Sequence, residues 1–143
     1  MSNLRHPSNG DDHPDAAGKH LDDAQVLLAA ERCDGAAYHA GYVVECSLKS
    51  VILVAGSNPW GHELPDLSRK AVSLAAMPSG SAARYAPGIV PGHSLYDAVH
   101  GWRSTLRYKS PGTVAAADAG AWVDEARRVY LATVARMRLD GVV

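Results

Sequence analysis

The chain has no phenylalanine, only two cysteines and no excess of charge of either sign. Its 143 residues include 15 acidic and 14 basic side chains, so the formal charges almost cancel. A balanced chain has no overall field that would draw it onto nucleic acid or an anionic membrane. Any contact with RNA must therefore come from a local basic patch.

Long apolar runs are also absent, and the N-terminus is polar, so we expect neither a signal peptide nor a membrane span. The two cysteines, Cys33 and Cys46, flank the start of one predicted helix and are poorly placed to form a disulfide. Reduced thiols are typical of the cytoplasm. We therefore predict a cytoplasmic protein that does not associate with membranes.

Apolar residues make up 47% of the chain, which is sufficient for the core of one domain of this length. Residues 1–18 are rich in charge and helix breakers, which predicts a flexible tail ahead of a helical domain over 19–143. His6, His13 and His20 match no zinc-ligand spacing, so we interpret them as solvated histidines. The sequence thus predicts neither a metal site nor a cofactor.

The strongest single element is the run from Asp34 to Gly56, which predicts one long helix. Asp34 suits the N-cap and Gly56 suits the position after the C-cap. Its apolar residues point in several directions at helical spacing, so other helices must cover most of its surface. We predict that it is the central helix of a bundle.

Polar residues on this helix form one stripe, since Tyr38, Tyr42, Glu45 and Lys49 follow at i, i+4, i+7 and i+11. Glu45 precedes Lys49 in the favourable order for an ion pair. The stripe is either an amphipathic edge, with the tyrosines covering the core, or the wall of a cleft or symmetric interface. In the second case Glu45 and Lys49 would be partly desolvated and functional.

Two further helices flank the central one. Apolar spacing predicts a helix over about 19–32, and the tight connection at 33–35 makes it an antiparallel hairpin with the central helix. Another helix begins near Pro65 and ends before Pro78. His62 lies just ahead of it, where the ring could bind a ligand or merely hydrogen-bond the free backbone of the helix start.

The second half of the chain predicts a long loop over 78–92, a fourth helix and a final helix. The fourth begins at Ser94, where the sequence Ser94-Leu-Tyr-Asp97 resembles a capping box. The final helix runs from the region 114–118 to about Leu139. With no strand required anywhere, the fold class is all-α, an up-and-down bundle of about five helices.

Basic residues gather near the predicted end of the fourth helix. Arg103 and Arg107 share one face there, next to Tyr108 and Lys109. Cations beside aromatic rings suit a nucleic-acid backbone with unstacked bases. Cations are equally typical of a helix C-terminus, where they offset the carbonyl dipole.

Three segments carry a more specific pattern. They are Asp34–Lys49, which holds the stripe, Gly61–Leu64 and Trp102–Tyr108. Together they resemble the HEPN family, the higher eukaryotes and prokaryotes nucleotide-binding domain, over roughly His20 to Met137. The resemblance implies an all-α bundle, commonly a homodimer, and members act as ribonucleases, often toxins, or as inactive partners of nucleotidyltransferases. The aromatic residues Trp102 and Trp122, which we expect on exposed helix faces, also favour a dimer.

The resemblance further implies a catalytic pattern, an arginine followed after four to six residues by a histidine, late in the bundle. There histidine would handle the 2′-hydroxyl proton and arginine the phosphate charge, without metal. The only match in this chain is Arg32 with His39, at the first hairpin. Chance alone predicts roughly one to two such matches in a chain of this composition. No histidine follows Arg103 or Arg107, so the late position lacks the pattern.

We therefore predict a non-catalytic module that binds a nucleotide, RNA, or a partner such as a nucleotidyltransferase or antitoxin. One alternative is a metal-independent endoribonuclease that uses Arg32 and His39. Another is a purely structural dimerisation module. The binding residues are predicted to border one groove and are Tyr42, Glu45, Lys49, His62, Arg107 and Tyr108.

Overall fold

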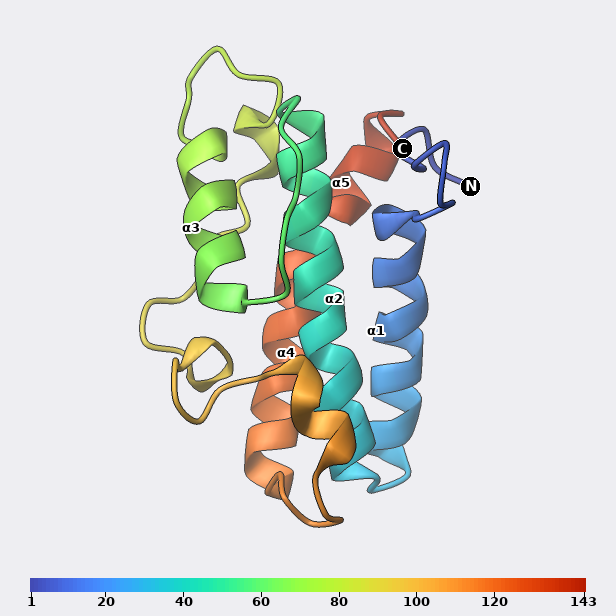
Figure 1. The fold of residues 1–143 in the computed structure, drawn as a ribbon, viewed down its shortest axis with the longest axis vertical. Helices are drawn as coiled ribbons and strands as arrows, with labels where there is room; N and C mark the ends of the chain where they lie inside the picture. Colours follow the sequence, from blue (N-terminus) through green and yellow to red (C-terminus); the bar gives the residue numbers. More distant parts are fainter.

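The structure is a computed structural model that describes residues 1–143, and it is all-helical, which confirms the predicted fold class. The helices are α1 (His13–Ala29), α2 (Cys33–Val54), α3 (Leu64–Ala75), α4 (Ala116–Ala132) and the short α5 (Val134–Leu139). Figure 1 shows α2 between α1 and α3, with α4 behind it. None of the helices combines the length and the hydropathy that crossing a bilayer requires.

Helix α2 is the centre of the bundle, as predicted, because it packs against α1, α3 and α4. Val43, Val44, Leu48, Val51 and Ile52 have no exposed surface at all. The helix ends as predicted at Gly56, whose φ of +77° lies in the left-handed region that glycine adopts without strain. The backbone amide of Ser57 then donates to the carbonyl of Ile52 over 3.0 Å, which closes the helix end.

The beginning of α2 differs from the prediction. The residue at the N-cap is Arg32, which makes no side-chain capping bond, and Asp34 lies inside the first turn. The two carboxylate oxygens of Asp34 accept hydrogen bonds from the backbone amides of Gly112 (2.6 Å) and Val114 (2.8 Å). The prediction of Asp34 as the N-cap was therefore wrong, since its carboxylate instead ties the loop before α4 to the start of α2.

Helix α1 begins at His13, six residues before the predicted start near Lys19. Asp12 caps this end by accepting a hydrogen bond from the backbone amide of Asp15, and Pro14 lies in the first turn. Residues 13–18, assigned to the tail on composition, are thus helical because their cap and proline are helix-start signals.

The predicted fourth helix is absent. Residues 76–115 contain only three short 3₁₀ turns, η1 (Ala83–Tyr85), η2 (Ser94–Tyr96) and η3 (Ser104–Tyr108). Asp97 does not close a capping box, because its carboxylate accepts from the backbone amides two and three residues further on. The hydroxyl of Ser94 is engaged elsewhere, accepting a hydrogen bond from the indole of Trp122 over 2.9 Å.

The predicted final helix is divided at Thr133, where the backbone leaves the helical region with φ −117° and ψ −88°. The hydroxyl of Thr133 donates to the carbonyl of Val129 over 2.7 Å, an interaction that competes with regular helix geometry. Helix α5 continues after this break and lies at the end of the bundle where both termini are found (Figure 1).

Trp102 and Trp122 are buried in the core, with 3% and 4% of their surfaces exposed. The indole of Trp102 lies on Gly41 of α2, and its nitrogen donates to the carbonyl of Tyr38 over 2.9 Å. The expectation that both rings lie on exposed faces was wrong, because long-range contacts of the irregular segment bury them. They give no support for a dimer.

Candidate functional site

The predicted stripe of α2 exists and its charged half is buried. Glu45 is 3% exposed and Lys49 is 8% exposed, and the Oε1 atom of Glu45 accepts from Lys49 Nζ over 2.9 Å. Two opposite charges are thus held away from water by the bundle, at a cost that only close pairing offsets.

His62 approaches the same carboxylate from the loop between α2 and α3. Its Nδ1 atom lies 2.9 Å from Glu45 Oε1, while 63% of its side chain remains exposed. The other oxygen of Glu45, Oε2, is buried and has no hydrogen-bond partner. The structure therefore brings together Glu45, Lys49 and His62, three of the predicted site residues. The exposed ring of His62 connects the buried Glu45–Lys49 pair to the solvent.

Tyr42 belongs to an aromatic cluster rather than to an open surface. Its ring stacks on His20 with centroids 5.2 Å apart, and it meets Trp102 and Tyr38 edge-on at 4.9 and 5.0 Å. Burial, with the neighbouring hydroxyl of Tyr38, raises the pKa of the Tyr42 hydroxyl well above its usual range. Tyr42 is therefore a packing residue that holds α1, α2 and the irregular segment together.

Arg107 and Tyr108 lie on η3, beyond the aromatic end of the stripe. The guanidinium of Arg107 lies 4.8 Å from the centre of the Tyr108 ring, and Tyr108 is 74% exposed. The neighbouring side chains of Tyr38 and Tyr108 raise the pKa of Arg107. The predicted site residues thus fall into two groups, one around Glu45 and one around Arg107.

A pocket of about 560 Å³ opens between the start of α2, η3 and the turn before α4. Arg32, Arg107 and Lys109 line it, together with Glu31 and Asp34. None of the three cations has a carboxylate partner within 4.0 Å. Backbone hydrogen bonds hold the pKa of Asp34 below its ordinary value, so that charge is already compensated.

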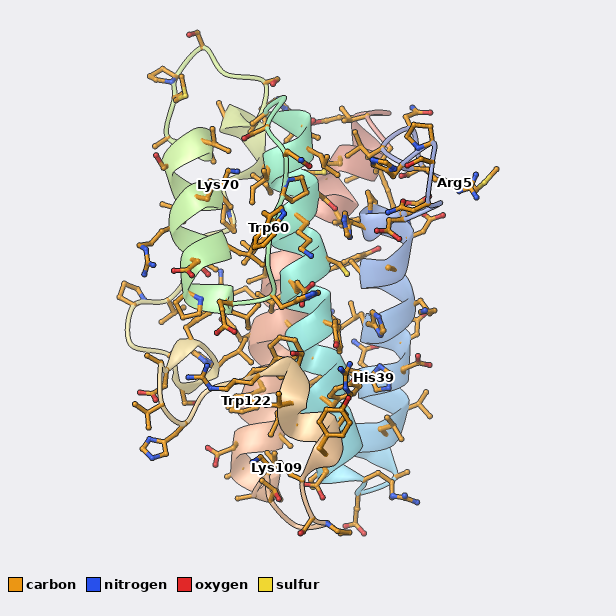
Figure 2. All side chains as sticks on the ribbon, in the orientation of Figure 1. Arg5, His39, Trp60, Lys70, Lys109 and Trp122 are labelled. Carbon is orange, nitrogen blue, oxygen red and sulfur yellow. The ribbon has the colours of Figure 1, made fainter.

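Arg32 and His39, the candidate catalytic pair, do not meet. Arg32 precedes α2 and lines the pocket, whereas His39 is not among the pocket residues. Seven residues of helix separate them by roughly 10 Å along the axis. Figure 2 shows Lys109 at the end of the bundle where the pocket lies and His39 further along α2, towards α1.

The sequence prediction missed two arrangements. It assigned Arg32 and Arg107 to different sites, although both line one pocket with Lys109. It also interpreted His20 as solvated, whereas the Nδ1 atoms of His20 and His39 are 2.9 Å apart. Periodicity within a helix carries no information on contacts between helices, so neither arrangement had a local pattern that reveals it.

These elements define a small all-helical domain with a basic pocket at the start of its central helix. The sequence model described as the HEPN domain matches residues 12–137, which is most of the chain, so the protein belongs to the HEPN domain family. The match begins at the residue that caps α1 and ends inside α5, and it therefore includes all of the bundle's long helices. Neither a curated protein nor a solved structure matches this chain.

Proposed function

We propose that the protein is a non-catalytic HEPN module that binds the phosphate groups of a nucleotide or of single-stranded RNA in the basic pocket. The observation that carries the proposal is the convergence of Arg32, Arg107 and Lys109, all without ion-pair partners, on one pocket of about 560 Å³. A pocket of this size accommodates a mononucleotide. Charge-assisted contacts to phosphate are among the strongest that such side chains make.

A base-stacking surface lies next to these cations. Tyr108 is exposed and its ring is held beside Arg107 by a cation–π contact. Proteins commonly bind single-stranded nucleic acids through exposed aromatic rings beside cations, because every base has a face that can stack on such a ring. Arg107 and Tyr108 therefore support RNA or a nucleotide over a simple inorganic anion.

Binding without turnover is proposed because no histidine lines the pocket. A general base must lie within hydrogen-bond reach of the proton that it removes. His39 is about two turns of α2 away from Arg32, and its ring nitrogen faces His20. The cations can hold a phosphate, but the histidine to which the family resemblance assigns the proton transfer of RNA cleavage is missing from the pocket.

A homodimer, and a nucleotidyltransferase or antitoxin as partner, rest on the family resemblance alone. Sedimentation at micromolar protein concentration tests the dimer directly. A clean monomer would remove the two-fold groove that the family resemblance implies, while leaving the pocket of each chain intact.

Fluorescence anisotropy with a labelled single-stranded RNA, and competition with ATP, test the proposal. Arg107→Ala should weaken binding at least about tenfold, the loss expected for one charge-assisted contact. Arg127→Ala is the matched control, because Arg127 is an exposed arginine of α4 outside the pocket. The affinity of the wild type should fall steeply with added salt, and Arg107→Ala should reduce that dependence.

Three results would contradict the proposal. Equal affinities for Arg107→Ala and Arg127→Ala would show that the pocket is not the binding site. RNA cleavage that His39→Ala abolishes would identify a ribonuclease. Absence of any salt-dependent binding to RNA or ATP, together with a stable dimer, would identify a structural module. Melting curves of both arginine variants should match the wild type, because both side chains are exposed.

A further inference from the structure

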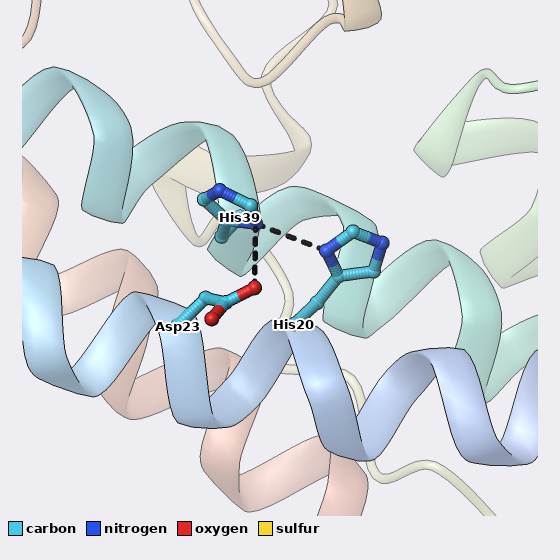
Figure 3. A group of neighbouring side chains, drawn as sticks. All are labelled: His20, Asp23 and His39. Carbon is cyan, nitrogen blue, oxygen red and sulfur yellow. Dashed lines mark hydrogen bonds and ion pairs between the residues drawn. The ribbon is translucent and has the colours of Figure 1, made fainter.

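A second polar cluster lies between α1 and α2, away from the basic pocket. His20 and Asp23 are three residues apart on α1 and share one face, and His39 faces them from α2 (Figure 3). The Nδ1 atoms of the two histidines are 2.9 Å apart, and Asp23 Oδ2 lies 3.9 Å from His39 Nδ1. One ligand atom from each of the three side chains lies within 4.8 Å of the others.

We propose that His20, Asp23 and His39 bind a divalent transition-metal ion of the zinc class, with the remaining coordination positions open to water. Two imidazoles and one carboxylate are the donor set of open zinc sites and of related cobalt, nickel and iron sites. Magnesium and calcium prefer oxygen ligands throughout, so this donor set selects against them.

The spacing of the two ring nitrogens fits one ion. With metal–nitrogen bonds of about 2.0–2.1 Å, two ligands lie about 2.9 Å apart at a right angle and about 3.3 Å apart at the tetrahedral angle. The observed separation is 2.9 Å. The distance between the two nitrogens therefore suits an ion with a right angle between its ligands, and a tetrahedral site needs a few tenths of an ångström more. The rings must also turn so that both lone pairs point to the ion and not to each other.

The carboxylate can complete the site by rotating. Two ligands of one ion can be separated by at most about 4.2 Å, which the distance of 3.9 Å from His39 to Asp23 already satisfies. The widest separation in the cluster, up to 4.8 Å, is slightly too long. The side chain of Asp23 is 51% exposed, so it is free to turn towards His20.

The two rings are held in the form that binds metal. Nitrogens that face each other at 2.9 Å cannot both carry a proton, so at least one lone pair is available. Burial, with the neighbouring Lys19, lowers the pKa of His20 to about 4, and burial also lowers the pKa of His39. Stacking on Tyr42 fixes the plane of the His20 ring, which reduces the ordering that binding requires.

An ion here would cross-link α1 to α2 and would not share a residue with the basic pocket. Metal binding at this cluster is therefore independent of the proposed nucleotide or RNA binding. RNA affinity should be unchanged by treatment with EDTA, because the cations of the pocket do not depend on the metal.

The test uses the full chain, stripped with EDTA and titrated with Zn²⁺ by isothermal calorimetry. One equivalent should bind to the wild type, and Asp23→Asn should weaken binding at least about tenfold because a charged ligand is lost. Asp22→Asn is the matched control, since Asp22 is an exposed neighbour on α1 that is not part of the cluster. Zn²⁺ should raise the melting temperature of the wild type and of Asp22→Asn, whereas Mg²⁺ should not.

Ligand identity is read from the ¹⁵N shifts of the imidazoles, which should move for His20 and His39 and stay fixed for the exposed His6 and His100. This measurement uses the wild type, so it does not depend on whether a His39 variant folds. Equal zinc affinity for Asp23→Asn and Asp22→Asn, or shifts only in the exposed histidines, would overturn the proposal.

Discussion

Replacing Gly41 by alanine tests the packing that places the irregular segment on α2. A Cβ atom at this position would lie 2.0 Å from the indole of Trp102, whereas ordinary contacts begin at 3.4 Å. The ring must therefore withdraw by roughly 1.4 Å, because protein interiors leave no space to absorb the overlap. Such a shift breaks the 2.9 Å hydrogen bond from the Trp102 indole to the carbonyl of Tyr38.

The free energy of unfolding should fall by about 3 kcal/mol. Overpacking a core costs about 1–3 kcal/mol. Leaving a buried donor without a partner adds about 1–3 kcal/mol. The better helix propensity of alanine returns about 1 kcal/mol. For a domain of this size the net loss corresponds to a decrease of about 10 °C in melting temperature, which calorimetry or circular dichroism measures.

Gly120 is the matched control, because a Cβ atom there meets no other atom and the residue also lies inside a helix, α4. Gly120→Ala should stabilise the protein by about 0.4–1 kcal/mol. Gly41→Ala in a Trp102→Ala background should also cost little, since the clashing ring is gone. If Gly41→Ala is as harmless as Gly120→Ala in the wild-type background, Trp102 does not pack on Gly41 of α2.

Three further changes follow from the same structure. Asp34→Asn should destabilise the protein at neutral pH and progressively less towards about pH 3. The pKa of Asp34 is lower in the folded protein than in the unfolded chain, so its carboxylate stabilises the fold above the unfolded pKa and loses this effect as the pH falls through the folded pKa. Denaturant melts at a series of pH values measure this change. At pH 8 a maleimide should label Cys33 and leave Cys46 unmodified, because burial raises the pKa of the Cys46 thiol to about 12, and equal labelling in mass spectra would contradict this burial. Glu45→Ala should cost about 3 kcal/mol or more in urea melts, since it leaves Lys49 buried and unpaired.

The parts of the fold that the sequence predicted correctly are those with local signals. The Gly56 helix end, the course of α2 and the start of α3 each depend on residues within a few positions of one another. The fourth helix was also predicted from local signals, but it is absent. Its apolar spacing and capping pattern were present in the sequence. Burying the Trp102 ring against Gly41 stabilises the protein more than the formation of this helix would.

In the candidate site, too, some residues could be predicted from local spacing and others meet only in the tertiary structure. The stripe with Glu45 and Lys49 follows from spacing within one helix, and His62 reaches it from the next loop. His20 and His39 meet only because the α1–α2 hairpin has a particular register, which no repeat in the sequence specifies. The pocket needs η3 to fold back onto the start of α2, and that contact depends on tertiary structure alone.

The long irregular segment between α3 and α4 is fastened to the bundle at separate points. Tyr85 donates to Asp140, Tyr96 donates to Glu125, and Trp102 is buried on α2. A longer chain between two such attachments lowers the stability only slightly, because doubling the length of a flexible loop adds only about 0.6 kcal/mol to the free-energy cost of closing it. Residues 90–92 lie between two of these attachments, are exposed and include a glycine with φ +76° and open space around it. This turn is thus the natural place to insert a tag or a fluorophore without disturbing the bundle, and the place where related chains can change length most freely.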